Sequence, residues 1–219
     1  MERWTLGKMQ NPIRGFLHGG AAMAALVGLA FLLSRAWGRA AAIVGALIFG
    51  MTMLLMYTVS SLYHSIPWGE RWKTRWQRLD HSTIFLMVAG TFTPIAIAAL
   101  DGVALVAGLG PIWAIALTGI LLKTLHANVK TGLSVTLQLS MGWVAVFWMP
   151  RIVDTLGIGA VALILLGGLF YTVGAVFFIT KRPRLAPRSF SYHELFHVFV
   201  VAASGFHFSA IFLYAIPAI

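Results

Sequence analysis

Two histidines stand four residues apart at the start of the last long apolar run, in Ser191-Tyr192-His193-Glu194-Leu195-Phe196-His197. On a helix this spacing puts the His193 and His197 imidazoles about 6 Å apart along the axis and about 40° apart around it, so both can reach one metal ion. The same letters spell H-E-x-x-H, the pattern in which helix-borne zinc proteases use the glutamate as general base. The sequence therefore predicts a metal site, and the other elements decide its use.

The composition is that of an integral membrane protein. Of the 219 residues, 59% are hydrophobic and 10% charged, and the mean hydropathy is +0.86. The net charge of +10 comes from short basic clusters between apolar runs. Such clusters are typical of cytoplasmic loops, so no nucleic-acid partner is predicted. Because the chain has no cysteine, a metal ion must be held by histidines and carboxylates.

Seven apolar runs are long enough to cross about 30 Å of hydrocarbon. They are Gly15 to Ser34, Ala41 to Tyr63, Asp80 to Leu100, Val103 to Lys123, Thr131 to Met149, Leu156 to Thr180 and Tyr192 to Ile216. The first run is too long for a signal peptide and is expected to be retained. The prediction is an all-α seven-transmembrane helix bundle that forms one domain over residues 1–219.

The distribution of basic residues predicts the orientation of the bundle. Thirteen Lys and Arg residues fall in the N-terminal segment and alternate loops, whereas Arg35, Arg39 and Arg151 lie on the opposite side. The N-terminus is therefore expected in the cytoplasm and the C-terminus outside. Between the second and third runs, a tryptophan recurs every four residues from position 68 to 76. This spacing predicts a short amphipathic helix on the inner membrane surface, the alternative being a basic loop with interfacial tryptophans.

This topology brings four polar residues to one membrane depth. His64 ends the second run, Asp80 begins the third, and His193 and His197 begin the seventh. Three neutral imidazoles with an open fourth position are typical of catalytic zinc, and Asp80 could orient or deprotonate a water there. Ser60 lies one turn deeper than His64, and its hydroxyl could bond the water, a ligand or a substrate carbonyl.

The other histidines are expected to be structural. A lone histidine near a helix end is more often interfacial or hydrogen-bonded than a ligand, which applies to His18, His81 and His126. His81 is about 100° around the helix from Asp80, so the two are not expected to face one site. His207 lies about 15 Å beyond His197 along the axis, too far to join its ion, and is expected to hydrogen-bond within the bundle.

Glu194 has two interpretations. It is the general base if the chain is an intramembrane metalloprotease, but no downstream pattern supplies the third ligand that such an enzyme needs. Otherwise it faces lipid headgroups or the basic residues Arg184 and Arg188.

The ordered motifs resemble the hemolysin III family, the bacterial branch of the superfamily that contains the adiponectin and progestin receptors (PAQR) and, more distantly, the alkaline ceramidases. The resemblance covers nearly the whole chain. It rests on Ser60-Ser61-Leu62-Tyr63-His64, on Arg78-Leu79-Asp80-His81-Ser82 continuing into Ala89-Gly90-Thr91-Phe92-Thr93-Pro94, and on His193-Glu194-Leu195-Phe196-His197 with Gly205-Phe206-His207-Phe208.

The resemblance implies a seven-helix fold with Zn²⁺ on His64, His193 and His197, a water-orienting Asp80, and Ser60 in the site. In the receptor branch the residue matching Glu194 resembles an amide, which argues against an essential base there. The location implied is the bacterial inner membrane, with membrane lipids as partners. Two functions remain open: a zinc-dependent, ceramidase-like hydrolase of lipid amides or esters, or a non-catalytic sensor or homeostasis protein with structural zinc, associated with a haemolytic (cytolytic) phenotype.

Overall fold

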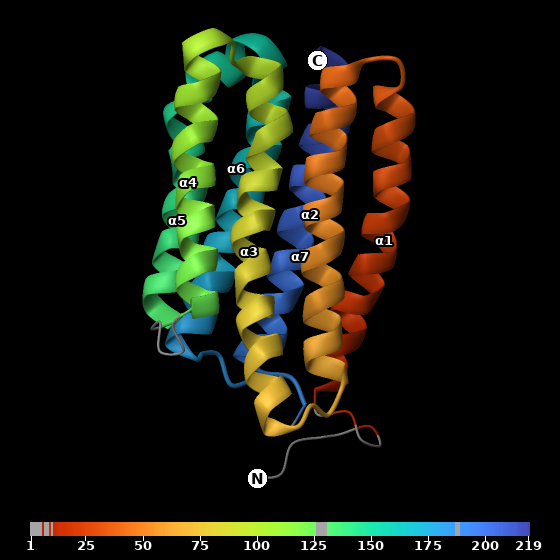
Figure 1. Ribbon diagram of the computed structural model, residues 1–219, viewed down its shortest axis with the longest axis vertical. Helices are drawn as coiled ribbons and strands as arrows, with labels where there is room; N and C mark the ends of the chain where they lie inside the picture. The colour runs from red at the N-terminus through yellow and green to blue at the C-terminus, as the bar shows by residue number, and fades with distance from the viewer. Residues whose placement is uncertain (1–5, 7–8, 10, 126–130, 187–188) are drawn as a thin grey trace.

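The computed structural model describes residues 6, 9, 11–125, 131–186 and 189–219, and its regular elements there are all helical. Figure 1 shows the long helices side by side in one bundle, with the start of α1 and the C-terminus at opposite ends. The elements are α1 (Pro12–Ala36), α2 (Ala40–Ser65), α3 (Glu70–Ala99), α4 (Gly102–Leu125), α5 (Thr131–Phe147), α6 (Met149–Thr180), α7 (Tyr192–Ala210), η1 (Ile211–Ala215) and α8 (Ile216–Ala218). The predicted all-α class is confirmed.

Six helical segments of the described chain are long and apolar enough to cross a membrane. They are Pro12–Ala36, Ala40–Ser65, Glu70–Ala99, Gly102–Leu125, Met149–Thr180 and Tyr192–Ala218. The remaining apolar helix, Gly132–Phe147, is shorter. At a rise of 1.5 Å per residue it reaches about 24 Å, which is less than the usual hydrocarbon thickness.

The residues around Trp72 are helical as predicted, but they do not form a separate short helix, because α3 starts at Glu70 and runs without a break to Ala99. Pro67 and Gly69 lie before this start, and no residue between Glu70 and Asp80 breaks a helix, so the amphipathic turns continue into the apolar ones. The Trp68 and Trp76 rings stack 4.6 Å apart across the turn, and Trp72 is 55% exposed.

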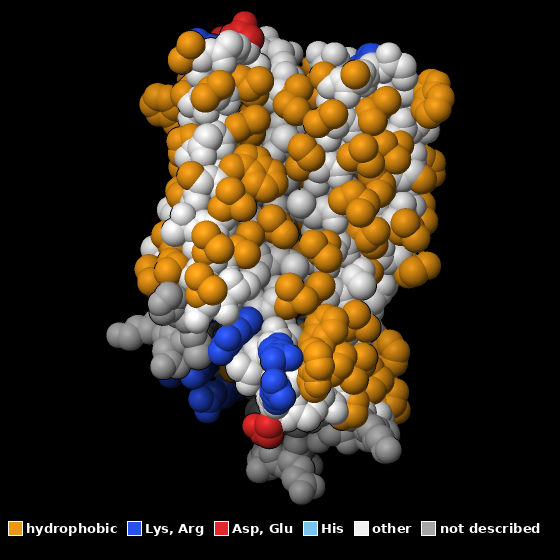
Figure 2. Space-filling model, in the orientation of Figure 1, with side chains coloured by type: hydrophobic (Ala, Val, Ile, Leu, Met, Phe, Trp, Pro, Cys, Tyr) orange, Lys and Arg blue, Asp and Glu red, His pale blue; other side chains and the backbone are white. Residues whose placement is uncertain are grey.

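The outer surface of the bundle suits lipid rather than water. Large apolar side chains such as Phe31, Val106 and Ile158 are more than half exposed. Figure 2 shows hydrophobic side chains over most of one face, while Lys and Arg gather near the lower end. A contiguous apolar surface of this extent would aggregate in water, whereas hydrocarbon solvates it.

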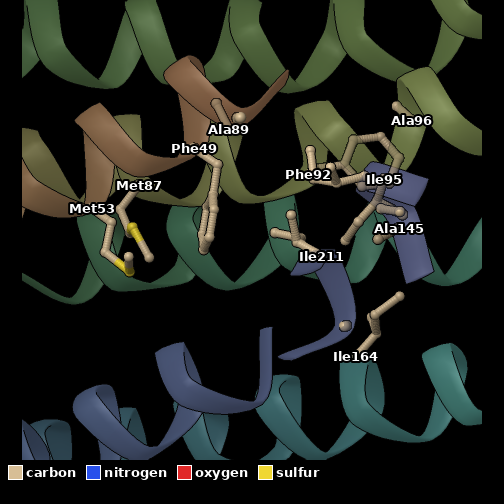
Figure 3. Packing of buried hydrophobic residues seen from close by; sticks show 14 of the residues in the cluster. Phe49, Met53, Met87, Ala89, Phe92, Ile95, Ala96, Ala145, Ile164 and Ile211 are labelled. Carbon is tan, nitrogen blue, oxygen red and sulfur yellow. The ribbon is translucent and has the colours of Figure 1, made fainter. Parts of the chain in front are cut away.

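Small residues let the helices pack closely. Figure 3 shows Phe49 and Met53 of α2 beside Ala89 and Met87 of α3, and Phe49 is fully buried. On α6, a Cβ added to Gly174 would lie 2.9 Å from the Phe199 Cβ, so only glycine admits α7 this closely. α6 itself is kinked at Gly157, where φ is 80°. Glycine adopts this conformation without a Cβ clash. Because this conformation is not helical, Met149–Thr180 consists of two helical stretches joined at Gly157, and the predicted sixth run from Leu156 matches the second of them.

Candidate metal centre

The end of α2 places His64 and Ser60 inside the bundle. Both side chains are 3% exposed, and they are one helical turn apart. Ile66, which follows the helix, is extended with φ −87° and ψ 133°. This is the conformation favoured by a residue before proline, so Pro67 ends α2 directly after the histidine.

The start of α7 is held by a capping box. The Ser191 side chain caps the backbone at Glu194, and the Ser191 N–H donates to Glu194 Oε2 at 2.9 Å. The cap starts the helix at Tyr192, so His193 and His197 occupy the first two turns and share a face as predicted.

A buried ion pair connects this cap to α1. Arg14 Nε donates to Glu194 Oε1 at 2.8 Å, and Arg14 Nη2 lies 2.7 Å from the same oxygen. The two side chains are 5% and 7% exposed. The interpretation in which Glu194 faces headgroups or Arg184 is therefore wrong, and Arg188 lies outside the described residues. The Glu194 carboxylate therefore caps α7 and also pairs with Arg14 of α1.

The three histidines predicted as ligands come together. One potential ligand nitrogen from each of His64, His193 and His197 lies within 4.8 Å of the other two. The ring centroids are 5.4 Å apart for His64 and His193, 4.9 Å for His64 and His197, and 5.0 Å for His193 and His197. The cluster could hold a metal ion.

The three histidines fit zinc if their imidazoles move slightly closer together. Tetrahedral zinc with Zn–N bonds of about 2.1 Å brings its nitrogens about 3.4 Å apart, so the imidazoles would move inward by about 1 Å or less. His197 is 2% exposed, and its Nδ1 has no hydrogen-bond partner among the described residues. A buried nitrogen without a partner is costly unless a ligand or ion engages it.

His18 belongs to this region, and the sequence interpretation missed it. Its ring lies 4.0 Å from that of His197 and edge-on to Tyr57 at 5.0 Å, and it is 3% exposed. This burial contradicts the interfacial role that was expected of His18. The available signal was Arg14 and His18 at i and i+4, two polar residues on one face of an apolar helix.

Asp80 and Ser60 meet beside the histidines. The Ser60 side chain interacts with the Asp80 carboxyl, and Asp80 is 8% exposed. Both residues line a cavity of about 250 Å³ whose wall also includes His18, His193 and His197. The structure therefore brings all five predicted site residues to one end of the bundle. His64 does not line the cavity, but its ring lies next to the rings of His193 and His197.

The cavity also reaches the outer surface of the bundle. Trp143 on α5 and Leu165 and Leu169 on α6 line it, yet these side chains are 57%, 46% and 55% exposed. These side chains have one side on the cavity and the other on the outer surface, so the wall there is one side chain thick. In a membrane this part of the wall, formed by α5 and α6, faces lipid.

Two remaining histidines also line the cavity. His81 does so together with Asp80, because a cavity this large spans more of the helix surface than one metal ion would, and His81 is not part of the three-histidine group. His207 is buried, and its Nε2 lies 3.2 Å from the Ile164 carbonyl, which confirms hydrogen bonding within the bundle. His126 lies outside the described residues.

Comparisons with known proteins cover nearly all of these elements. The family described as "Haemolysin-III related" matches residues 7–208. The "Hemolysin-3 homolog" of Bacillus subtilis (strain 168) is 32% identical over 201 residues, 91% of each chain. "Hemolysin-3" of Bacillus cereus is 31% identical over 221 residues, 99% of this chain and 97% of that protein. The human "Monocyte to macrophage differentiation factor" is 25% identical over 181 residues, 77% of this chain and 69% of that protein.

These matches span α1 to α7, including the helix ends that carry the three histidines. The predicted resemblance is confirmed, and the human relative fits the wider PAQR superfamily. Multi-pass helical architecture agrees with the six apolar segments. The chain belongs to the haemolysin III family.

Proposed function

We propose that this protein is a zinc-dependent hydrolase that cleaves an amide or ester bond of a membrane lipid. The observation that carries the proposal is the position of His193, His197 and the Asp80–Ser60 pair on one cavity whose outer wall faces lipid, with the His64 imidazole directly beside the other two. The cavity wall beyond this polar end is mostly apolar, which suits an acyl chain.

His64, His193 and His197 would hold the zinc ion. Zinc supplies Lewis acidity, which activates a water and polarises a carbonyl. In this proposal Asp80 accepts a proton from the attacking water and returns it to the leaving amine or alkoxide, so the acyl bond breaks with the net addition of one water. Ser60 holds the Asp80 carboxyl in place through its hydroxyl.

The proposal includes a topology and a location. Residues 1–219 form a single domain in which α5 also crosses, so seven helices span the membrane, with the N-terminus in the cytoplasm and the C-terminus outside. It is supported by the opposite placement of the start of α1 and the C-terminus, and by the basic side chains at the lower end in Figure 2. The bacterial relatives support the plasma membrane as the location.

The test uses two variants. His64→Ala should lose zinc and turnover together. Asp80→Asn should keep zinc, because the three histidines remain, yet lose lipid amide or ester hydrolysis by about 100-fold or more. Zinc content, melting temperature and hydrolysis by membranes or purified protein measure these effects. Zinc retained at full occupancy in His64→Ala, or near-normal hydrolysis in Asp80→Asn, contradicts the proposal.

A structural role for the metal is the second candidate. α2 and α7 are far apart in sequence, and an ion shared by His64, His193 and His197 would fasten them together. The protein would then be a membrane homeostasis or sensor protein, and the names of the relatives associate a haemolytic phenotype with such proteins. In that case Asp80→Asn lowers activity no more than it lowers thermal stability.

A metalloprotease is the remote alternative, and the geometry disfavours it. The general base of such an enzyme must face the water that it deprotonates. Both Glu194 oxygens are already engaged, Oε1 by Arg14 and Oε2 by the Ser191 amide. Glu194→Gln would abolish cleavage in a protease, whereas here it should act through stability and metal affinity.

A further inference from the structure

The far end of the cavity has polar residues that the proposed chemistry does not use. His207 and Tyr171 line the same cavity as His197, and their rings stack with centroids 5.6 Å apart. His207 is ten residues after His197 on α7, which is about 15 Å along the helix axis. These side chains therefore lie deep in the apolar part of the bundle, where unused polar groups are costly.

The hydrogen bond of His207 determines which nitrogen carries the proton. His207 Nε2 lies 3.2 Å from the Ile164 carbonyl oxygen, and a carbonyl only accepts, so Nε2 donates. In a neutral imidazole the other nitrogen is then an acceptor. His207 is 7% exposed, and its Nδ1 has no hydrogen-bond partner among the described residues. The ring edge with Nε2 packs against Gly167 of α6.

The hydroxyl groups of Ser204, Tyr57 and Tyr171 already donate hydrogen bonds within the protein. Ser204 Oγ donates to the Val200 carbonyl at 2.9 Å, so it accepts from Tyr57 at 2.6 Å and from Tyr171 at 2.8 Å. Each tyrosine proton is thereby committed to Ser204. The Tyr171 oxygen keeps acceptor capacity, as does His207 Nδ1. This end of the cavity therefore accepts hydrogen bonds and offers no proton of its own.

We propose that His207 and Tyr171 form a second subsite, which binds a hydroxyl group on the hydrocarbon chain of the lipid. A hydroxyl supplies the missing donor, whereas a chain carbonyl or a plain methylene leaves Nδ1 unsatisfied. This inference rests on the proposed function, because it takes the lipid carbonyl to sit at the histidine cluster. It goes further by naming the substrate class, an amide or ester of a mid-chain hydroxy acid.

The spacing of the two ends predicts where that hydroxyl lies. An extended chain with C–C bonds of about 1.5 Å and tetrahedral angles advances about 1.25 Å per carbon. The rise of about 15 Å between His197 and His207 thus corresponds to about twelve carbons. A neutral hydrogen bond exchanged for one to water changes affinity by about two- to tenfold.

The experiment compares binding of matched lipids to Asp80→Asn protein in nanodiscs, where slow turnover leaves the ligands intact. The probes are the amides of octadecanoic acid and of its 12-hydroxy and 7-hydroxy derivatives. The 12-hydroxy amide should bind about two- to tenfold more tightly than the other two. Adding His207→Phe or Tyr171→Phe should reduce this preference, and Ser209→Ala, a partly exposed position of α7 that does not line the cavity, should not.

The outcomes separate the inference from the proposed function. Equal binding of all three amides overturns the second subsite and leaves the hydrolase proposal standing, as does a preference that persists in both His207→Phe and Tyr171→Phe. If the His207 variant does not fold, the comparison of the 12-hydroxy and 7-hydroxy amides on the Asp80→Asn protein still tests the subsite. A preference for the 12-hydroxy amide without hydrolysis by the wild type supports the subsite and contradicts the hydrolase proposal. Failure of every amide to bind overturns both.

Discussion

The Arg14–Glu194 pair is the contact whose removal should disturb this protein most sharply outside the ligands themselves. Arg14 is on α1 and Glu194 lies between the two α7 histidines, with Arg14 Nη2 2.7 Å from Glu194 Oε1. Glu194→Gln removes the charge but keeps a side chain that can still cap the helix. Arg14→Met removes the cation and keeps most of the stem. Each variant leaves one charged group buried beside a neutral one.

The burial of the Arg14–Glu194 pair determines how much stability is lost when one partner is removed. The pair is 5% and 7% exposed, and breaking a pair buried to this degree by removing one partner costs about 3 to 5 kcal/mol. Replacing both partners costs much less than the sum, because no charge is left uncompensated. The surface pair of Arg151 and Asp101 is the matched control: the atoms are 3.9 Å apart, and the side chains are 56% and 98% exposed. Arg151→Met should have no measurable effect.

The assay is equilibrium unfolding in mixed micelles together with zinc titration. Glu194→Gln and Arg14→Met should each lower stability strongly, and the double variant should recover much of the loss. Because Glu194 precedes the His197 turn and caps the helix that carries both ligands, zinc affinity should fall by about 10- to 100-fold in the single variants. Additive losses of about 1 kcal/mol or less, equal to those of a surface pair, would refute the reasoning.

Three other predictions address the site, its protonation and the topology. His18→Phe should keep zinc, since it preserves the ring against His197 and His18 is outside the three-histidine group; zinc loss equal to that of His64→Ala, measured by metal analysis, would make His18 a ligand. Zinc should be released on acidification, because protons compete with the metal for the imidazole nitrogens, and a metal content unchanged by acid would argue against histidine ligands. A reporter after Ile219 should be external and one at Glu70 cytoplasmic, and a cytoplasmic C-terminus would show that the chain crosses an even number of times.

Much of the architecture was readable from the chain because membrane solvation acts on each helix separately. Every segment that enters hydrocarbon must satisfy its own backbone hydrogen bonds, so a long apolar run implies a helix. The i, i+4 spacing of His193 and His197 likewise depends only on helix geometry, and His64 could be placed with them from the alternation of loops. Local rules of this kind need no knowledge of neighbours.

Helix boundaries were less predictable where hydropathy changes inside a continuous helix. α3 begins ten residues before the predicted Asp80, because amphipathic turns and apolar turns share the same backbone hydrogen bonding. α6 (Met149–Thr180) joins two helical stretches at the non-helical Gly157, and the predicted run from Leu156 covered only the second stretch. Hydropathy reports where lipid begins, and a helix does not have to end there.

The sequence alone determined the class of the protein, its apolar helices and the three histidines that could share an ion, since these follow from composition and from distances along one helix. Tertiary structure decided the rest. Arg14 and His18 looked like residues near a helix end, and only the packing of α1 against α7 pairs one with Glu194 and stacks the other on His197. The hydroxyl at Ser204 is polar in any context, but its neighbours Tyr57 and Tyr171 come from two other helices. Which protons are committed, and which acceptors are left facing a cavity, depends on contacts between helices that no spacing along the chain specifies.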